Sequence, residues 1–223
     1  MSKVNIEWSS NFAYAIGLIA SDGAVNKDQR HVWFSSKDLE LITKFRTALK
    51  LTNTIGRYAR GGETEKRYFC MTFGDVAFVS FLNQIGITNA KSKTIRSVEI
   101  PKEYFRDFLR GLFDGDGTFY TFQDRRWPNS FGYKISWASA SHVFIMWLQN
   151  ILASSYGVRG FMKIGNGVYN LTYVKGDTRK LIEAMYAHKP SLFLKRKYSK
   201  VCTALEADTK FGKLFLQKQR MPQ

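Results

Sequence analysis

The stretch FLRGLFDGDGTFY, residues 108–120, joins an apolar run to two aspartates that are each followed by a glycine. A second stretch, FAYAIGLIASDGAV at residues 12–25, has the same order of features. When LRGLFDGDG is laid over AIGLIASDG, Asp116 falls on Asp22 and Gly111 falls on Gly17. One pattern at two places in a chain predicts an internal duplication, which other landmarks can test.

The other landmarks recur in the same order in both halves. WFSSKDLELITKF resembles WASASHVFIMWLQ, and YFCMTFGDVAFVSFLNQIG resembles VYNLTYVKGDTRKLIEAMY. GITNAKSKTI then corresponds to SLFLKRKYSK, and the larger spacing in the second half fits an insertion at 124–130, which reads as a long hairpin loop. The sequence therefore predicts two tandem repeats, residues 1–97 and residues 98–223, the second ending in a basic tail.

Each repeat reads as an α+β unit of helix, two strands, helix, two strands and helix. Apolar and polar residues alternate in the strand segments, and glycine-containing turns join the hairpins. The predicted strand pairs are 24–28 with 31–35, 54–60 with 67–73, 118–122 with 132–138, and 158–164 with 168–174. Helices are predicted near 38–50 and 141–153. The last helix of each repeat begins near Asp75 or Asp177, which we interpret as N-caps.

Charge indicates a polyanionic partner. Lys and Arg number 34 against 18 acidic residues, which gives a formal charge of +16. This charge favours nucleic acid or an anionic membrane surface. Apolar runs such as HVFIMWLQNIL are shorter than the ~20 residues of a membrane span, and MSKVNIEWSS lacks the features of a signal or transit peptide. We therefore expect a soluble protein, and the sequence does not predict its cellular location. Cys70 and Cys202 form no CxxC pair, so we expect reduced thiols rather than zinc ligands.

The first helix of each repeat ends at the aspartate-glycine pair, and we call it the motif helix. Small residues line one side of each motif helix. Gly17 and Ser21 are four residues apart and share a helix face, as do Gly111 and Gly115. Glycine costs roughly 1 kcal/mol relative to alanine inside a helix, so a close approach of two helix backbones is the expected compensation. Gly23 and the corresponding Gly117 are expected to end the helices in the left-handed conformation.

Two such helices side by side bring Asp22 and Asp116 together. Neighbouring carboxylates repel each other unless a cation offsets their charge. Oxygen ligands without a histidine or cysteine partner favour Mg²⁺, and the carbonyls of Ser21 and Gly115 at the helix ends can add ligands. The plainer interpretation of DGDG is a simple turn. An EF-hand is disfavoured, because the segment lacks the further acids and the closing glutamate.

The segments AIGLIASDG (15–23) and LRGLFDGDG (109–117) resemble the LAGLIDADG motif of homing endonucleases, and the likeness extends over roughly 8–205. The resemblance implies a single-chain, two-motif member of the family. It implies two four-stranded antiparallel sheets that form a DNA-binding saddle, with the paired motif helices at the centre. Its activity would be a metal-dependent staggered double-strand break in a long DNA target. Asp22 and Asp116 occupy the position of the family's essential acid. Asp114 has no acidic counterpart, because Ala20 replaces it, and is expected to be structural.

The resemblance also implies basic residues near the scissile phosphates. Lys91 and Lys195 correspond best to these basic residues of the family. Lys93 and Lys197 are the alternatives, one step away in register. Their plainer interpretation is a solvated charge. Relatives often carry a glutamine after the second strand, where this chain has Ser36, Ser139 or Ala140, so the water-positioning group is unassigned.

The implied partner is double-stranded DNA, bound by a monomer. Mg²⁺ is the expected cofactor, Mn²⁺ is expected to replace it, and Ca²⁺ is expected to bind without supporting cleavage. The candidate DNA contacts are Lys27, Gln29, Arg30, Arg57, Arg60, Lys66, Arg67, Arg125, Arg126, Lys134, Arg159 and Lys163. The pattern does not sort them into base and phosphate contacts.

Three other functions are considered. An intron-encoded RNA maturase would use the same basic surface on host intron RNA, alone or together with cleavage. A non-cleaving DNA-binding regulator would keep the helices and lose the metal, and the presence of both acids argues against it. A small histidine-dependent nuclease is disfavoured, because His31, His142 and His188 have no ligand spacing.

Overall fold

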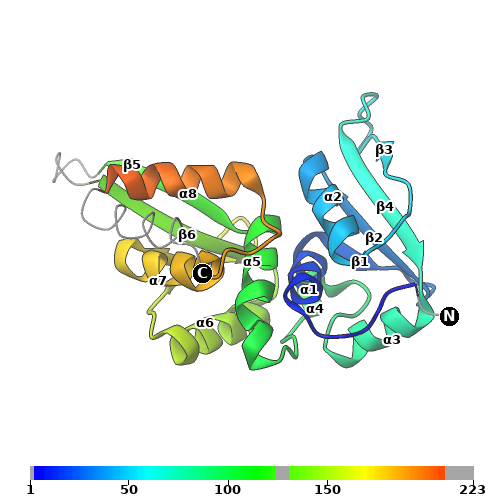
Figure 1. Ribbon diagram of the computed structural model, residues 1–223, viewed down its shortest axis with the longest axis horizontal. Coiled ribbons are helices and arrows are strands. Elements are labelled where there is room, and N and C mark those ends of the chain that lie inside the picture. The colour runs from blue at the N-terminus through cyan, green and yellow to red at the C-terminus, as the bar shows by residue number, and fades with distance from the viewer. Residues whose placement is uncertain (1–2, 124–130, 209–223) are drawn as a thin grey trace. The chain divides into compact units, whose positions relative to one another are not determined.

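The computed structural model describes residues 3–123 and 131–208 of the chain. The chain divides into two compact units, Met1–Asp116 and Gly117–Gln223 (Figure 1). Each unit contains one antiparallel sheet and its own helices. Arg125 and Arg126, two of the predicted DNA contacts, lie outside the described residues.

The first unit begins and ends with a motif helix. Its elements are α1 (Ser10–Asp22), β1 (Gly23–Val25), β2 (His31–Ser36), α2 (Leu39–Ala48), β3 (Gly56–Tyr58), β4 (Tyr68–Gly74), α3 (Val76–Gln84), α4 (Lys91–Thr94), the 3₁₀ turn η1 (Lys102–Tyr104) and α5 (Phe105–Gly115). The four strands form an antiparallel sheet in the order β1-β2-β4-β3.

The second unit has the same sheet topology. Its elements are β5 (Thr118–Gln123), β6 (Phe131–Ser139), α6 (His142–Tyr156), β7 (Phe161–Gly165), β8 (Val168–Val174), α7 (Lys175–Tyr186) and α8 (Lys195–Ala207), and its sheet order is β5-β6-β8-β7. Along the chain, α1 to α3 and α5 to α7 both read αββαββα, followed by α4 and α8. This confirms the predicted α+β class with tandem repeats and two four-stranded antiparallel sheets.

The compact units do not coincide with the predicted repeats. The boundary between units lies at Asp116, because α5 packs on α1 of the first unit although it opens the second repeat of the sequence. The repeat boundary at residues 97 and 98 stays a prediction.

Each sheet has one face covered by helices and one face that the helices of its unit leave open. On β2, Val32 and Phe34 are fully buried while Trp33 between them is half-buried, and the Phe34 ring stacks on Phe45 of α2 with centroids 4.3 Å apart. On β6, Ile135 and Trp137 are buried in the same alternating manner. Alternation thus gives each sheet a hydrophobic inner face and an outer face, which we call the open face.

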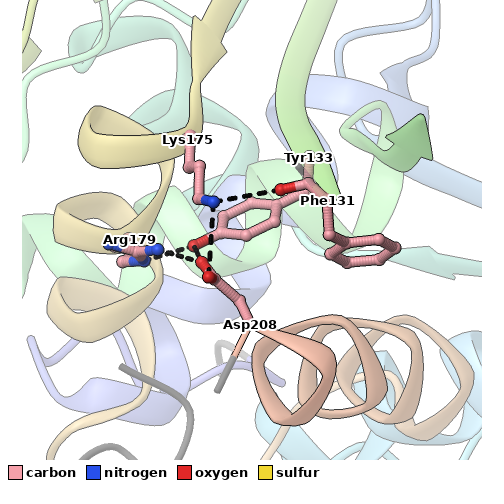
Figure 2. A network of polar contacts seen from close by, with 5 residues as sticks. All are labelled: Phe131, Tyr133, Lys175, Arg179 and Asp208. Carbon is pink, nitrogen blue, oxygen red and sulfur yellow. Dashed lines mark hydrogen bonds and ion pairs between the residues drawn. The ribbon is translucent and has the colours of Figure 1, made fainter. Parts of the chain in front are cut away.

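Figure 2 shows how the end of α8 is held within the second unit. Asp208, directly after α8, accepts hydrogen bonds from the Tyr133 hydroxyl at 3.0 Å and from the Arg179 guanidinium, and Lys175 Nζ lies 3.3 Å from its other oxygen. Burial alone would raise the pKa of Asp208, but the hydrogen bonds from Arg179, Tyr133 and Lys175 outweigh burial and lower it. The network joins α8 to α7 and β6.

Asp75 caps α3. One carboxylate oxygen accepts a hydrogen bond from Phe78 N at 3.0 Å, and the other accepts from Lys3 N at 2.6 Å and Val4 N at 2.9 Å. The residue therefore also holds the N-terminal segment, a role that the capping pattern alone does not predict.

The corresponding prediction for Asp177 is wrong. α7 begins at Lys175 with Val174 as its N-cap, so Asp177 lies inside the first turn. Its carboxylate accepts a hydrogen bond from Arg159 N at 2.8 Å, and a negative charge in the first turn still complements the helix dipole.

The predicted left-handed end of the first motif helix at Gly23 is also wrong. Gly23 has φ −83° and ψ 163°, which is extended backbone, and it starts β1 directly. A Cβ at this position would lie 2.7 Å from Ile19 Cα, so lack of space rather than conformation explains the glycine.

Candidate active site

Helices α1 and α5 approach each other at backbone distance in the first unit. A Cβ at Gly17 would lie 2.7 Å from Leu112 N, and a Cβ at Gly111 would lie 3.0 Å from the carbonyl carbon of Tyr14. Neither position has room for a side chain, because the facing atoms belong to the other helix's backbone. This close packing offsets the helix-destabilising effect of the two glycines.

The same approach continues to the ends of the two helices. A Cβ at Gly115 would lie 2.6 Å from Ser21 Cβ and 3.3 Å from Asp22 Oδ2. The Ser21 hydroxyl donates to the carbonyls of Leu18 at 3.0 Å and Gly17 at 3.2 Å, so it is engaged within its own helix. The Asp22 carboxylate thus lies beside the last turn of α5, and Asp116 follows directly on that turn.

A buried lysine lies at the end of α1, close enough to sense the charges of both acids. Lys91 opens α4 after Ala90, whose left-handed backbone (φ 56°) turns the chain. Only 6% of Lys91 is exposed, and its Nζ donates to Ser21 O at 2.7 Å. Burial lowers the pKa of Lys91 to about 8, although the negative charges of Asp116 and Asp22 act in the opposite direction. The buried amine therefore contacts a helix-end carbonyl of α1 and lies within the electrostatic influence of both carboxylates.

In the second unit a lysine of α8, Lys197, contacts the backbone next to the other motif acid. Its Nζ donates to Gly117 O at 2.5 Å, and Gly117 is the residue directly after Asp116 in the chain. Lys195 is exposed at the first position of α8. Lys93, the other register alternative, is exposed on α4. The motif KRK at 195–197 contains both candidates of the second repeat.

Asp114 is buried between the paired helices. It is 1% exposed, and its Oδ2 accepts a hydrogen bond from the Tyr14 hydroxyl at 2.8 Å, across a separation of 100 residues. The guanidinium of Arg110 lies 5.4 Å from the Tyr14 ring and pairs with Asp107 at 2.7 Å. Buried polar contacts of this kind fix the register of the two helices.

The donor set suits a hydrated divalent cation. Within residues 3–123 and 131–208, no group of three or more His, Cys, Asp or Glu side chains could hold a metal ion. Asp22 and Asp116 offer two carboxylates, and Ser21 and Gly115 offer helix-end carbonyls, of which Ser21 O already accepts from Lys91. Mg²⁺ typically uses one or two protein carboxylates and completes its octahedron with water and substrate phosphate. The residues present therefore fit Mg²⁺.

The serines at the place of the family's glutamine brace turns. Ser36 Oγ accepts from Asp38 N at 3.1 Å, and Ser139 Oγ accepts from Ser141 N at 3.1 Å. Both precede the N-cap of a helix, α2 and α6 respectively. The water-positioning group is still unassigned.

The described candidate DNA contacts lie in turns, in loops and on strands of the two units. Exposed positions are held by Lys27, Gln29, Arg30, Arg57, Arg60, Lys66, Arg67, Arg159 and Lys163, and Lys134 is half-buried on β6. Some are engaged locally: Gln29 accepts from Asn83 at 3.0 Å, Arg67 pairs with Glu65 at 2.7 Å, and the Arg57 guanidinium lies 4.8 Å from the Phe69 ring. Their roles in DNA contact stay predictions.

These features define a class of protein: a tandem α+β chain whose glycine-lined motif helices end in a pair of acids. The sequence model of the LAGLIDADG-like domain matches residues 9–94 and again 103–184. The chain belongs to this family. Comparison with curated protein sequences gave no significant match.

Solved structures share the fold at low sequence identity. Full-length DUF199/WhiA from Thermatoga maritima is 16% identical with a TM-score of 0.57, over 100% of this chain and 66% of that chain, so the chain spans just under two thirds of that protein. The I-LtrWI LAGLIDADG homing endonuclease bound to target DNA is 11% identical with a TM-score of 0.60, over 96% of this chain and 98% of that one. I-SmaMI bound to an uncleaved DNA target in the presence of calcium ions is 13% identical with a TM-score of 0.60, over 92% and 93%.

Among the helices in the described part of the chain, none is both long enough and apolar enough to cross a bilayer.

Proposed function

We propose that this chain is a site-specific homing endonuclease that makes a staggered, metal-dependent double-strand break in a long DNA target. The observation that carries the proposal is the close packing of the ends of α1 and α5, which puts Asp22 Oδ2 beside Gly115, directly before Asp116, with the buried Lys91 amine on Ser21 O. A structural turn would not require a buried amine beside two acids, whereas phosphodiester hydrolysis uses both charges.

The two acids have the role of cation ligands. Asp22 and Asp116, assisted by the carbonyl oxygens of Ser21 and Gly115, would hold Mg²⁺, with Mn²⁺ as a substitute. When bound, the ion supplies an activated water, polarises the phosphate and stabilises the leaving oxygen. One acid from each repeat provides one ligand set per DNA strand, so a monomer can cut both strands.

The lysines would act on the negative charge of the phosphate. Lys91 is already held with its amine at Ser21 O, where it can stabilise the charge that develops during cleavage. In the second repeat the candidates for this role are Lys195 and Lys197, and the contact of the Lys197 amine with Gly117 O, directly after Asp116, supports Lys197.

DNA binding would use the open faces of the sheets. A formal charge of +16 favours a polyanion, and a major groove about 12 Å wide accommodates strands. We propose that the open face of each sheet contacts the duplex. I-LtrWI and I-SmaMI, which share the fold, were both solved with DNA, the latter uncleaved with calcium ions, which supports a duplex partner and Ca²⁺ as a non-productive ion.

A second candidate is a protein of this fold that binds DNA without cutting it. The similarity to DUF199/WhiA over the whole chain favours it, because the fold occurs there outside proteins described as homing endonucleases. The two candidates differ in what happens to bound DNA when Mg²⁺ is present.

The test is therefore binding followed by cleavage. Duplexes of random sequence are selected on the purified chain in Ca²⁺, recovered, and then incubated with the chain in Mg²⁺, Mn²⁺, Ca²⁺ or EDTA. We expect both strands to be cut at fixed staggered positions in Mg²⁺ and Mn²⁺ only. Selected duplexes that stay intact in Mg²⁺ and Mn²⁺ would contradict the nuclease proposal and favour the second candidate.

A further inference from the structure

The open face of the first sheet carries aromatic rings where a DNA-reading surface would carry bidentate side chains. Trp33 and Tyr58 make an edge contact with centroids 5.4 Å apart, and Tyr58 and Tyr68 lie at the same separation. The Tyr58 hydroxyl donates to Ser35 Oγ at 3.1 Å, which orients the ring. Strands β1 to β4 are described in full, and their open-face positions hold no Arg, Lys, Asn or Gln.

Cations occur beside these strands and lie against the same rings. Lys37 Nζ is 5.0 Å and the Arg60 guanidinium is 5.8 Å from the centroid of the Tyr68 ring. Both residues belong to the segments that leave β2 and β3, so they lie at the margin of the face. If a duplex lies on this face, the marginal cations would meet phosphates and the rings would meet base edges.

The second sheet also carries exposed rings on its open face. Phe122 and Phe161 are among the exposed large hydrophobic residues, at 36% and 38%, and pairing with Gly132 and Thr172 puts both on the open face. The Phe122 ring lies over Gly132, where a Cβ would be 2.5 Å from its Cζ. A glycine in the middle strand is thus explained by the ring that crosses it.

The lysines of this face are held over its rings. Lys134 Nζ is 4.5 Å from the Phe122 centroid and 5.9 Å from that of Tyr120, and Lys163 Nζ is 5.6 Å from that of Phe161. A lysine in this position is a weaker guanine reader than one that extends from the sheet, because part of its donor capacity faces the ring. Asn170, on the same face of β8, is the side chain type that pairs with adenine.

Each base pair presents a different pattern of hydrogen-bonding groups and methyl groups in the major groove, so the side chains of a face predict which bases it prefers. Guanine is recognised mainly by arginine or lysine and cytosine by acids, whereas the thymine methyl group is recognised by apolar and aromatic contact. Both open faces carry aromatic residues and no acid. The first holds no arginine or lysine at the open-face positions of its strands, and the two lysines of the second lie near its rings. A cluster of exposed rings on one face is also the kind of surface that commonly marks a binding site.

We infer that the base pairs under both open faces are predominantly A·T and are read through the 5-methyl groups of thymine. The inference rests on the proposed function, since it assumes that a duplex lies on these faces. It names the chemical class of the target: a duplex whose two half-sites are A·T-rich, held at the margins by phosphate contacts.

Uracil tests methyl readout directly, because it differs from thymine only by that group. Duplexes selected in Ca²⁺ are sequenced, and each thymine of the consensus is replaced in turn by deoxyuridine. We expect a consensus dominated by A·T pairs, and about fourfold weaker binding for each contacted methyl group removed. The effect of uracil should shrink in Phe122→Ser and Phe161→Ser for the thymines that those rings contact.

Ile164→Ser is the matched control. Ile164 is 75% exposed on the same strand as Phe161 but points to the other face of the sheet, so this variant should keep the full effect of uracil. The wild-type uracil scan is interpretable even if a phenylalanine variant does not fold.

The outcomes separate the inference from the function on which it rests. A consensus dominated by G·C, or deoxyuridine without effect at every thymine, would overturn methyl readout and leave a DNA-binding nuclease intact. Failure to enrich any duplex, or tighter binding to a single-stranded oligothymidine than to every selected duplex, would overturn both.

Discussion

Lys91 shows how burial and charge compete at a single residue. Its amine is almost inaccessible, which disfavours the charged form, while two neighbouring carboxylates favour it. Burial wins, and the pKa falls from 10.5 to about 8. A lysine with this pKa is mostly protonated at neutral pH, so it can serve as a cation there and become neutral in mild alkali.

The shifted pKa of Lys91 predicts a pH dependence of stability. Between pH 8 and 10.5 the unfolded state binds more protons than the folded state, so the free energy of unfolding rises with pH in this window, by at most on the order of 3 kcal/mol. Below about pH 8 the cost of burying the charge is fully present. Denaturant titrations in EDTA at pH 7 to 10 should show the stability of wild type rising relative to Lys91→Met. A difference between the two that does not change with pH would contradict the assigned pKa.

A second prediction distinguishes Lys197 from Lys195. If Lys197 stabilises charge at the phosphate, Lys197→Met should lower kcat roughly 10²-fold, as loss of one such donor does in other enzymes. Lys195→Met should change kcat little and alter affinity only through the lost surface charge. Single-turnover cleavage of the selected duplex measures both. A larger loss of kcat in Lys195→Met would reverse the assignment.

Some site residues could be predicted from the sequence, whereas others are evident only in the structure. Asp22, Asp116 and Lys91 could be nominated from the duplication and the family motif. Tyr14 could not be, because its role is to donate to Asp114, 100 residues away, and only the packed helix pair creates that contact. Lys195 and Lys197 were both candidates in KRK, and the contact of Lys197 with Gly117 O could not be read from the sequence.

At the scale of elements, the decisive feature is the α1–α5 contact. The glycine stripe predicted a close approach, and the backbone atoms that face Gly17 and Gly111 leave no space for a methyl group. The order of helices and strands followed from periodicity and turn residues. The errors were at helix ends, at Asp177 and Gly23, where one or two residues decide between cap and first turn, and where close packing can select glycine without a left-handed backbone.

The helix contact predicts opposite effects of one substitution at two sites. Gly111→Ala should destabilise the protein by about 1–3 kcal/mol or more, because the helices must separate, and it should lower cleavage by moving Asp116 relative to Asp22. Gly176→Ala is the control: it lies in α7 with nothing within 4 Å of an added Cβ, so helix propensity should make it neutral or stabilising by up to about 1 kcal/mol. Thermal unfolding of both variants checks this. Equal effects at the two sites would contradict backbone packing at Gly111.

At the scale of the whole molecule, charge dominates the expected encounter with DNA. An excess of 16 positive charges on 223 residues draws the chain to any duplex before sequence is read. We predict a steep linear fall of log affinity with log salt concentration, because each phosphate contact releases counterions. Equilibrium binding between about 50 and 200 mM salt should show a loss on the order of 10³-fold or more for six or more such contacts. Affinity that is insensitive to salt would contradict a basic DNA-binding surface.

The proposal as a whole depends on Asp22 and Asp116 acting together as the cleavage centre. The most direct measurement is strand-resolved cleavage of an end-labelled duplex in Mg²⁺ by wild type, Asp22→Asn and Asp116→Asn, with affinity measured in parallel in Ca²⁺. Asparagine preserves the size of the side chain and removes its charge, so both variants should bind DNA nearly as wild type does and lose double-strand cleavage by roughly 10²-fold or more. Cleavage of both strands at the wild-type rate by either variant would contradict the account.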